Sequence, residues 1–250
     1  MVRAGLLAVA LLAVALTLAW TGVAQASLIL VPGPTPANSF IDLGAQGFGN
    51  APRLLTLQTN TFESGFETPI DVEHGDAVDG ANKSTTPTLA AAGWTAGNKV
   101  GIGFNSDQSG QTGITLQTLV LTIYDVNAAH TVLGTFSLAS PITFTAADLA
   151  MQQGNGNAVF NFGLDAAQQA QFNTIVAAHG LTIFAGLGSS LGCAAGAPAS
   201  CLVSNDGPDT FVAFVQGTGT PIPEPGTLLL LGSGLASVGA WTRRRMGKRS

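Results

Sequence analysis

The segment ITLQTLVLTIY, residues 114–124, decides the fold class because it is a long, β-branched run of the kind that forms strands. Alternate residues from Thr115 to Ile123 would share one face of this strand. Leu116, Val120 and Tyr124 would lie on the other face. Shorter patterns of the same kind occur on both sides of it. They cover residues 53–59, 100–104, 131–138, 142–144, 159–162, 181–184 and 211–216.

Turn-forming residues separate these short strands. Asn, Asp, Ser and Gly occupy residues 105–107, 155–157 and 205–207, where the chain is expected to reverse direction. Regular short strands divided by such turns predict a mainly β body. We expect a β-sandwich or jelly-roll-like body over residues 27–220.

One or two short helices interrupt the strand pattern. Residues 166–179 are rich in Ala and Gln, follow the N-cap residue Asp165 and precede Gly180, which can end a helix. A shorter helix is expected over residues 146–152, capped by Thr145. In both cases a polar residue three positions after the cap strengthens the prediction.

Charge is sparse in this chain and mostly negative in its body. Charged residues make up 9% of the sequence, against about 25% in typical soluble domains, and Gly provides 32 of the 250 residues. Residues 27–220 contain three basic residues and 13 acidic ones, a net charge of −10. Such a body would repel a phosphate backbone, so nucleic acid is not expected as a partner.

Residues 1–26 have the pattern of a secretory signal peptide. Arg3 precedes an apolar run over residues 6–20, and the small residues Ala24 and Ala26 then form a cleavage pattern. We expect cleavage after Ala26, so that the exported chain begins at Ser27. The alternative is a retained membrane anchor, for which the apolar run is short.

The last 30 residues, 221–250, fall into three parts. The hinge PIPEP, residues 221–225, stays extended because proline fixes φ and removes backbone donors. An uncharged segment follows, and a single transmembrane helix of marginal length is expected at about 227–242. The basic tail over residues 243–249 would keep the C-terminus in the cytoplasm. The body, residues 27–220, would therefore lie on the far side of the inner membrane.

The run IPEPGTLLLLG, residues 222–232, with the arginines after it resembles the PEP-CTERM sorting signal. Ile222 and Gly226 stand where the commonest family form has Val and Ser, and the resemblance covers residues 221–250 only. An ordinary membrane anchor with a chance Pro-Glu-Pro is the alternative. The residues that carry the resemblance are Pro223, Glu224 and Pro225 of the sorting motif and Arg243, Arg244 and Arg245 of the basic stop.

This resemblance implies a route through the cell. In the PEP-CTERM family the tail is processed by exosortase, a membrane-embedded enzyme of Gram-negative bacteria that make exopolysaccharide. It implies export, a transient inner-membrane intermediate, and delivery to the cell surface or extracellular matrix. The expected partners are therefore exosortase, the membrane before processing, and exopolysaccharide.

Cys193 and Cys201 are the only cysteines, and the segment between them is rich in turn residues. In an oxidising compartment they should form a disulfide, worth about 2–3 kcal/mol in the entropic view. A metal-binding or redox pair is the alternative, but the spacing fits neither a zinc knuckle nor a redox motif.

Four carboxylates lie close together in the segment DVEHGDAVDG, residues 71–80. They could wrap a Ca²⁺ ion, which takes six to eight oxygen ligands from flexible loops. Their spacing does not match an EF-hand loop, so a solvated acidic loop is favoured and no metal or other cofactor is expected. The four residues are Asp71, Glu73, Asp76 and Asp79.

No motif for nucleophilic, metal-dependent or phosphate-transfer catalysis is present in the sequence, so we do not expect an enzyme. Glu63 and Glu67 would share one face of a strand, and a weak glycan hydrolase would use them. Trp94 is the only tryptophan between residues 27 and 220, and a lectin-like domain would expose it.

The composition favours one function among these. Sparse charge combined with many Gly, Thr, Asn and Gln residues gives polar, uncharged surfaces that suit contact with hydrated polysaccharide. We expect a non-enzymatic surface, biofilm or extracellular-matrix protein. The alternatives are a secreted lectin-like module, a weak hydrolase, or a protein that stays anchored in the periplasm.

Overall fold

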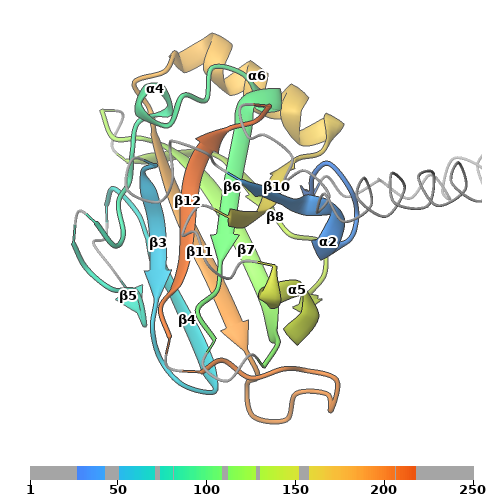
Figure 1. Cartoon of the computed structure of the whole chain (residues 1–250). Coiled ribbons are helices and arrows are strands. Elements are labelled where there is room, and N and C mark those ends of the chain that lie inside the picture. The colour runs from blue at the N-terminus through green and yellow to red at the C-terminus, as the bar shows by residue number, and fades with distance from the viewer. Residues whose placement is uncertain are drawn as a thin grey trace, which may run out of the picture.

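The computed structural model describes residues 27–42, 51–70, 74–80, 82–108, 112–127, 130–151, 158–205 and 207–217. The body is built from two antiparallel sheets that face one another (Figure 1). The predicted mainly β architecture is therefore confirmed, and the jelly-roll assignment stays a prediction. The expected signal peptide over residues 1–26 and the expected tail over residues 221–250 lie outside the described residues.

Each sheet consists of six strands. The first sheet has the order β1 (Leu28–Leu30), β10 (Ala158–Leu164), β6 (Val100–Asn105), β12 (Asp209–Val215) and β3 (Arg53–Leu57), with β2 (Phe40–Asp42) also paired to β10. The second sheet has the order β5 (His74–Gly75), β4 (Phe62–Glu67), β11 (Phe184–Gly192), β7 (Ile114–Asp125) and β8 (Thr131–Ser137), with β9 (Ile142–Phe144) also paired to β7.

Strand β7 confirms the main sequence prediction, with one correction. Leu119, Leu121 and Ile123 are fully buried and point into the core, as alternation predicts. Leu116 also belongs to the core, because the register against β11 shifts between the Leu119 and Leu116 pairings. The prediction that Thr115 shares the face of Leu119 is therefore wrong, since an irregularity in the ladder reverses the alternation.

The core between the two sheets is dominated by phenylalanines. Phe104 stacks on Phe211 with ring centroids 4.9 Å apart, and Phe144 packs against Phe160 at 4.5 Å. These rings come from β6, β12, β9 and β10, so they join both sheets. Offset and tilted aromatic pairs of this kind add stability beyond the area that they bury.

The outer face of the first sheet is covered as well. A second apolar cluster lies on it, and Gly101 and Gly103 of β6 leave room for this cluster. A Cβ atom at Gly101 would lie 2.8 Å from the ring of Phe214, and one at Gly103 would lie 2.8 Å from Val159. Strand β6 is therefore buried on both sides, whereas its alternating pattern predicts burial on one side only. The cluster consists of Ile41, Ala51, Val159, Val212 and Phe214.

The two predicted helices are present. Helix α6 (Ala166–His179) has the predicted bounds; Asp165 caps it by accepting from Gln168 N at 2.8 Å, and Gly180 follows with φ +74°. It lies across one end of the sandwich (Figure 1). Helix α5 (Ala146–Ala150) starts with a complete capping box on Thr145.

Three shorter helical segments complete the described secondary structure. They are α2 (Pro36–Ser39), α4 (Leu89–Ala92) and the 3-10 turn η2 (Gly97–Lys99). In the part of the chain that the structure describes, no helix has the length and apolar character needed to cross a bilayer.

One predicted strand is misplaced. Residues 181–183 precede β11, which begins at Phe184 and continues to Gly192 as a central strand of the second sheet. The sequence FAGLGSSLG hides this strand because Gly and Ser are poor strand formers. Its place between β4 and β7 is maintained by pairing on both sides.

Candidate functional site

The outer face of the second sheet carries an open hollow. Gly186 and Gly188 occupy consecutive outward positions on β11, so a strip in the middle of the sheet has no side chains. Gly188 pairs with Phe66 of β4 on one side and with Val120 of β7 on the other. The result is a depression of about 330 Å³ that we call the β11 trough. It is lined by Phe66, Thr68, Ile70, Val120, Thr122, Tyr124, Gly186, Leu187 and Gly188.

The walls of the β11 trough combine rings and hydroxyl groups. Phe66 is 39% exposed, and its ring packs against His74 of β5 with centroids 4.7 Å apart. Tyr124 forms part of the opposite wall, and Thr68 and Thr122 add hydroxyl groups. Asp, Glu, Lys and Arg are absent from the residues that line the trough. It is therefore a partly apolar, uncharged surface with some hydrogen-bonding capacity.

A pair of buried carboxyl groups joins the two sheets. Glu63 of β4 and Asp209 of β12 are both fully buried and form a side-chain hydrogen bond with each other. Glu63 also accepts from Ser204 Oγ at 3.0 Å and from Thr59 N at 3.2 Å. Asp209 accepts from Gln108 Nε2 at 3.1 Å. Two carboxyl groups in such contact must share a proton, because two adjacent buried negative charges repel each other.

The environment places this proton on Glu63. Burial, with the hydrogen bond to Asp209 and the charge of Asp209, raises the pKa of Glu63 to about 10, although the hydrogen bonds from Ser204 and Thr59 oppose the rise. Burial also raises the pKa of Asp209, but hydrogen bonds from Glu63, Ser106 and Gln108 oppose that rise. Asp209 accepts more hydrogen bonds, which favour its ionised form. Glu63 is therefore the protonated partner, and it donates a hydrogen bond to Asp209.

The carboxylates suggested for a hydrolase face inward. Glu63 and Glu67 do share one face of β4, as alternation predicts, but that face is buried. A glycan cannot reach the fully buried Glu63 carboxyl in this conformation. The arrangement is instead that of a buried polar contact between two sheets.

Trp94 is a core residue, so it is not the exposed aromatic residue that a lectin-like domain would present. Its side chain is fully buried, and Nε1 donates to Phe214 O at 2.9 Å. Gly93, with φ +72°, ends α4 and turns the chain so that Trp94 enters the core. A buried tryptophan usually donates its indole N–H to a hydrogen-bond acceptor, as Trp94 does here.

The acidic segment is only partly described. Asp71 and Glu73 lie outside the described residues. Asp76 accepts from Ser64 N at 2.8 Å and so joins this segment to β4, whereas Asp79 is exposed. Within the described ranges no group of three or more His, Cys, Asp or Glu side chains could hold a metal ion.

The disulfide between Cys193 and Cys201 is present, with the two Cα atoms 5.9 Å apart. It closes the loop that follows β11. Gln117 Nε2 donates to Gly192 O at 2.9 Å and so joins this loop to β7. The crosslink therefore secures the end of the central strand.

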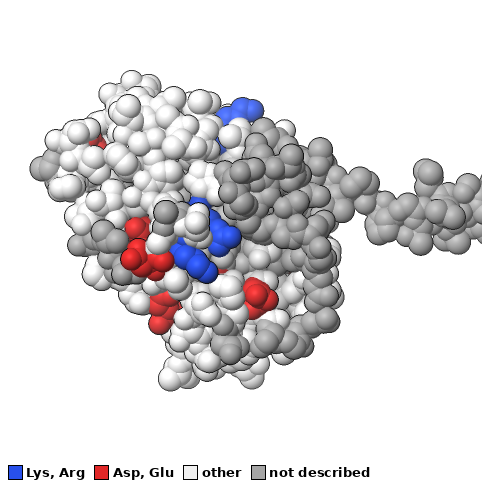
Figure 2. Space-filling model, turned by 60° about the vertical axis from the view of Figure 1, so that its left-hand side comes forward, with Lys and Arg blue, Asp and Glu red and all other residues white. Residues whose placement is uncertain are grey.

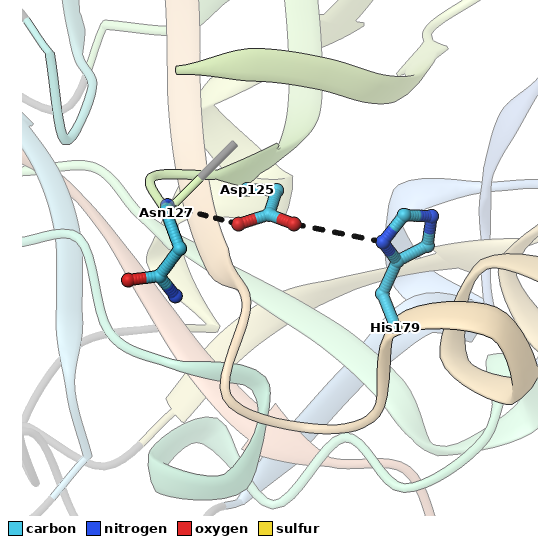
Figure 3. Close-up of polar contacts among 3 residues, drawn as sticks. All are labelled: Asp125, Asn127 and His179. Carbon is cyan, nitrogen blue, oxygen red and sulfur yellow. Dashed lines mark hydrogen bonds and ion pairs between the residues drawn. The ribbon is translucent and has the colours of Figure 1, made fainter. Parts of the chain in front are cut away.

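Helix α6 is joined to β7 through a polar contact at its C-terminus. Asp125 accepts from Asn127 N at 2.9 Å, and its other oxygen lies 3.6 Å from His179 Nδ1 (Figure 3). When His179 is protonated, the cation lies at the negative end of the helix dipole. Because both side chains are partly exposed, the contribution is at most about 1 kcal/mol.

Charged side chains are sparse on the surface as well. In the view of Figure 2 most of the surface of the described residues is white; one basic patch lies beside acidic groups near the middle, and a second basic patch lies apart from it near the top. That face offers no extended basic surface of the kind that a phosphate backbone requires.

Residues 221–245 match the PEP-CTERM protein-sorting motif. The chain carries this sorting motif. The match includes Pro223, Glu224 and Pro225, and it confirms the resemblance seen in the tail. The PEP-CTERM motif is consistent with an exosortase substrate, and it implies export and sorting to the cell surface. Searches of curated proteins and of solved structures gave no match.

Sequence reasoning found the sorting motif and the disulfide but missed the β11 trough and the carboxyl pair. The partners of Glu63 lie far along the chain, and nothing in their local sequence marks them. A signal for the trough was present, because glycines alternate at 186 and 188 beside a long apolar strand. Glycine inside a strand often marks the close approach of a ligand or of another backbone.

Proposed function

We propose that this chain is an exported, non-enzymatic protein of the cell surface or extracellular matrix. It would pass through a transient inner-membrane intermediate in a Gram-negative bacterium, and exosortase would remove its tail. The observation that carries the proposal is the PEP-CTERM motif at residues 221–245. The disulfide is compatible with an oxidising compartment outside the cytosol.

At its destination the body would contact hydrated polysaccharide. The described surface supports this role because charge is sparse and the β11 trough is lined by uncharged groups. The hydrolase alternative has less support, since the Glu63 carboxyl is buried. A lectin-like module remains the second candidate, and it would use the β11 trough in place of Trp94.

The intact mass of the exported protein tests the sorting route. In cells that have exosortase, the surface form should lack residues 243–249, whereas cells without the enzyme should retain the full tail in the membrane fraction. Glu224→Ala should block processing, because this carboxylate lies in the recognition motif. Pro221→Ala, just outside the Pro-Glu-Pro triplet, is the matched control and should be processed normally. Recovery of surface protein that still has its terminal arginines would refute the proposal.

A further inference from the structure

The β11 trough is open because of a residue choice that packing does not require. At Gly186 a Cβ atom would lie 2.8 Å from Glu67 O and 2.9 Å from Tyr124 Cε2, so the fold needs glycine there. At Gly188 a Cβ atom would lie 3.3 Å from Phe66 Cβ, a tight contact that a displacement of a few tenths of an ångström relieves. Gly188 also lacks a positive φ, so a β-branched residue would suit this strand position better. Packing therefore does not explain why residue 188 is glycine. The missing side chain leaves the trough open.

We propose that the β11 trough binds an uncharged polysaccharide chain laid over Gly188, beside the ring of Tyr124, which packs against Gly186. The proposal rests on the proposed function, since it names the site through which the exported body would contact matrix polysaccharide. It assigns the trough walls, with Phe66 on one side and Tyr124 on the other, as the sugar-binding surface.

The chemistry of the walls selects a neutral sugar. Aromatic rings pack against the apolar C–H faces of a sugar ring, and hydroxyl groups such as that of Thr122 exchange hydrogen bonds with sugar hydroxyls. An acidic polysaccharide would need cations to pair with its charges. The basic residues of the described part, Arg53, Lys83 and Lys99, are not among the trough residues.

The position of the trough argues against a protein ligand. An extended peptide binds a sheet by adding to an edge strand, whereas β11 is central and paired on both sides. A hollow of about 330 Å³ is also small compared with the surface that a stable protein interface buries. The outer face of the first sheet already has its own apolar cover, which leaves the second sheet as the exposed one.

Affinity electrophoresis of the exported, processed protein tests this site. The gels would contain hydroxyethylcellulose or dextran as neutral probes, alginate as an acidic probe, or exopolysaccharide from the producing cells. We expect retardation by at least one neutral polymer and by the cells' own polysaccharide. Phe66→Ala removes one wall and Gly188→Val fills the floor, so each should weaken retardation about tenfold. Thr174→Ala, an exposed change on α6, which contributes no residue to the trough lining, should leave it within about twofold.

The outcomes separate the site from the wider function. If wild type is retarded and both trough variants are retarded equally, the site is wrong but the function stands. If the wild-type protein is not retarded by any of the four polymers, both the proposed site and the proposed contact with polysaccharide fail. Correct tail processing would still support the sorting route. Preference for alginate, or dimerisation abolished by Gly188→Val, would also overturn the proposal. Burial of Trp94, measured by its fluorescence, shows that each variant is folded, and two independent variants guard against one that misfolds.

Discussion

The pH dependence of stability should reveal the proton that Glu63 shares with Asp209. Burial, together with the hydrogen bond and the charge of Asp209, raises the pKa of Glu63 from its ordinary value of 4.5 to about 10. Between these values the folded protein binds one more proton than the unfolded chain does. The free energy of unfolding therefore falls as the pH rises. The stabilisation is complete below the ordinary pKa of 4.5 and is lost as the pH rises toward about 10.

The size of the effect follows from one linked proton. Its uptake changes the free energy of unfolding by about 1.4 kcal/mol per pH unit. From about pH 5 to about pH 8, this pair should thus lower the stability of the wild-type protein by up to about 4 kcal/mol. Glu63→Gln removes the dependence, because the amide N–H can donate to Asp209 and the amide oxygen can accept from Ser204 without a proton being taken up. The free energy of unfolding of Glu63→Gln should fall by less than about 1 kcal/mol from about pH 5 to about pH 8. At about pH 8 the variant should therefore be more stable than the wild-type protein.

Urea unfolding of the exported protein, followed through Trp94 fluorescence, measures this difference. A change of about 4 kcal/mol moves the urea midpoint by more than about 1 M for a domain of this size. Asp107→Asn is the matched control, because it removes an exposed carboxylate beside the pair and should keep the wild-type slope. The shared proton would be refuted if the free energy of unfolding of the wild-type protein did not change with pH, or if Glu63→Gln showed the same change with pH as the wild type.

Three further results are expected of the same exported protein. Replacing Cys193 and Cys201 together by Ser should lower the free energy of unfolding by about 2–3 kcal/mol, and an unchanged urea midpoint would contradict this. Trp94→Phe should lower it by about 2–4 kcal/mol through a cavity and a lost hydrogen bond, as measured by calorimetry because the variant lacks the fluorescent probe. Polysaccharide retention should persist, and loss of binding by a folded variant would argue against a purely structural role. Asp165→Asn should destabilise the processed chain by about 1 kcal/mol if Ser27 carries its charged amino group, and equal stability by calorimetry would exclude that pairing.

Sequence patterns predicted the elements whose local chemistry is strong. The β-branched run in β7 and the capped, Ala-rich helix α6 both form where expected. Strand β11 was missed, because its glycines and serines lower local strand propensity while pairing on both sides maintains it. The glycines that conceal this strand are also the ones that open the trough. The proposed sugar-binding surface therefore lies where local strand propensity is weakest.

The interior contacts could not be predicted for a different reason. Glu63 and Asp209 belong to strands of different sheets, so only the packing of the sheets brings them together. The position of Trp94 likewise depends on the turn at Gly93 and on a backbone acceptor in β12. Residue type alone suggested a surface aromatic and an accessible carboxylate, whereas tertiary burial decided both.

Two separate sequence predictions meet at one contact in the structure. Cleavage after Ala26 would leave Ser27 with a free amino group, and Asp165 was predicted only as a helix cap. Ser27 N in fact donates to Asp165 Oδ2 at 2.5 Å, while Oδ1 of the same carboxylate accepts from Gln168 N at the start of α6. If the leader is removed at this bond, the backbone N–H becomes an ammonium group and the contact gains charge. Export would then strengthen the attachment of β1 to the sandwich, because β1 follows Ser27 directly and pairs with β10, the strand that leads into Asp165.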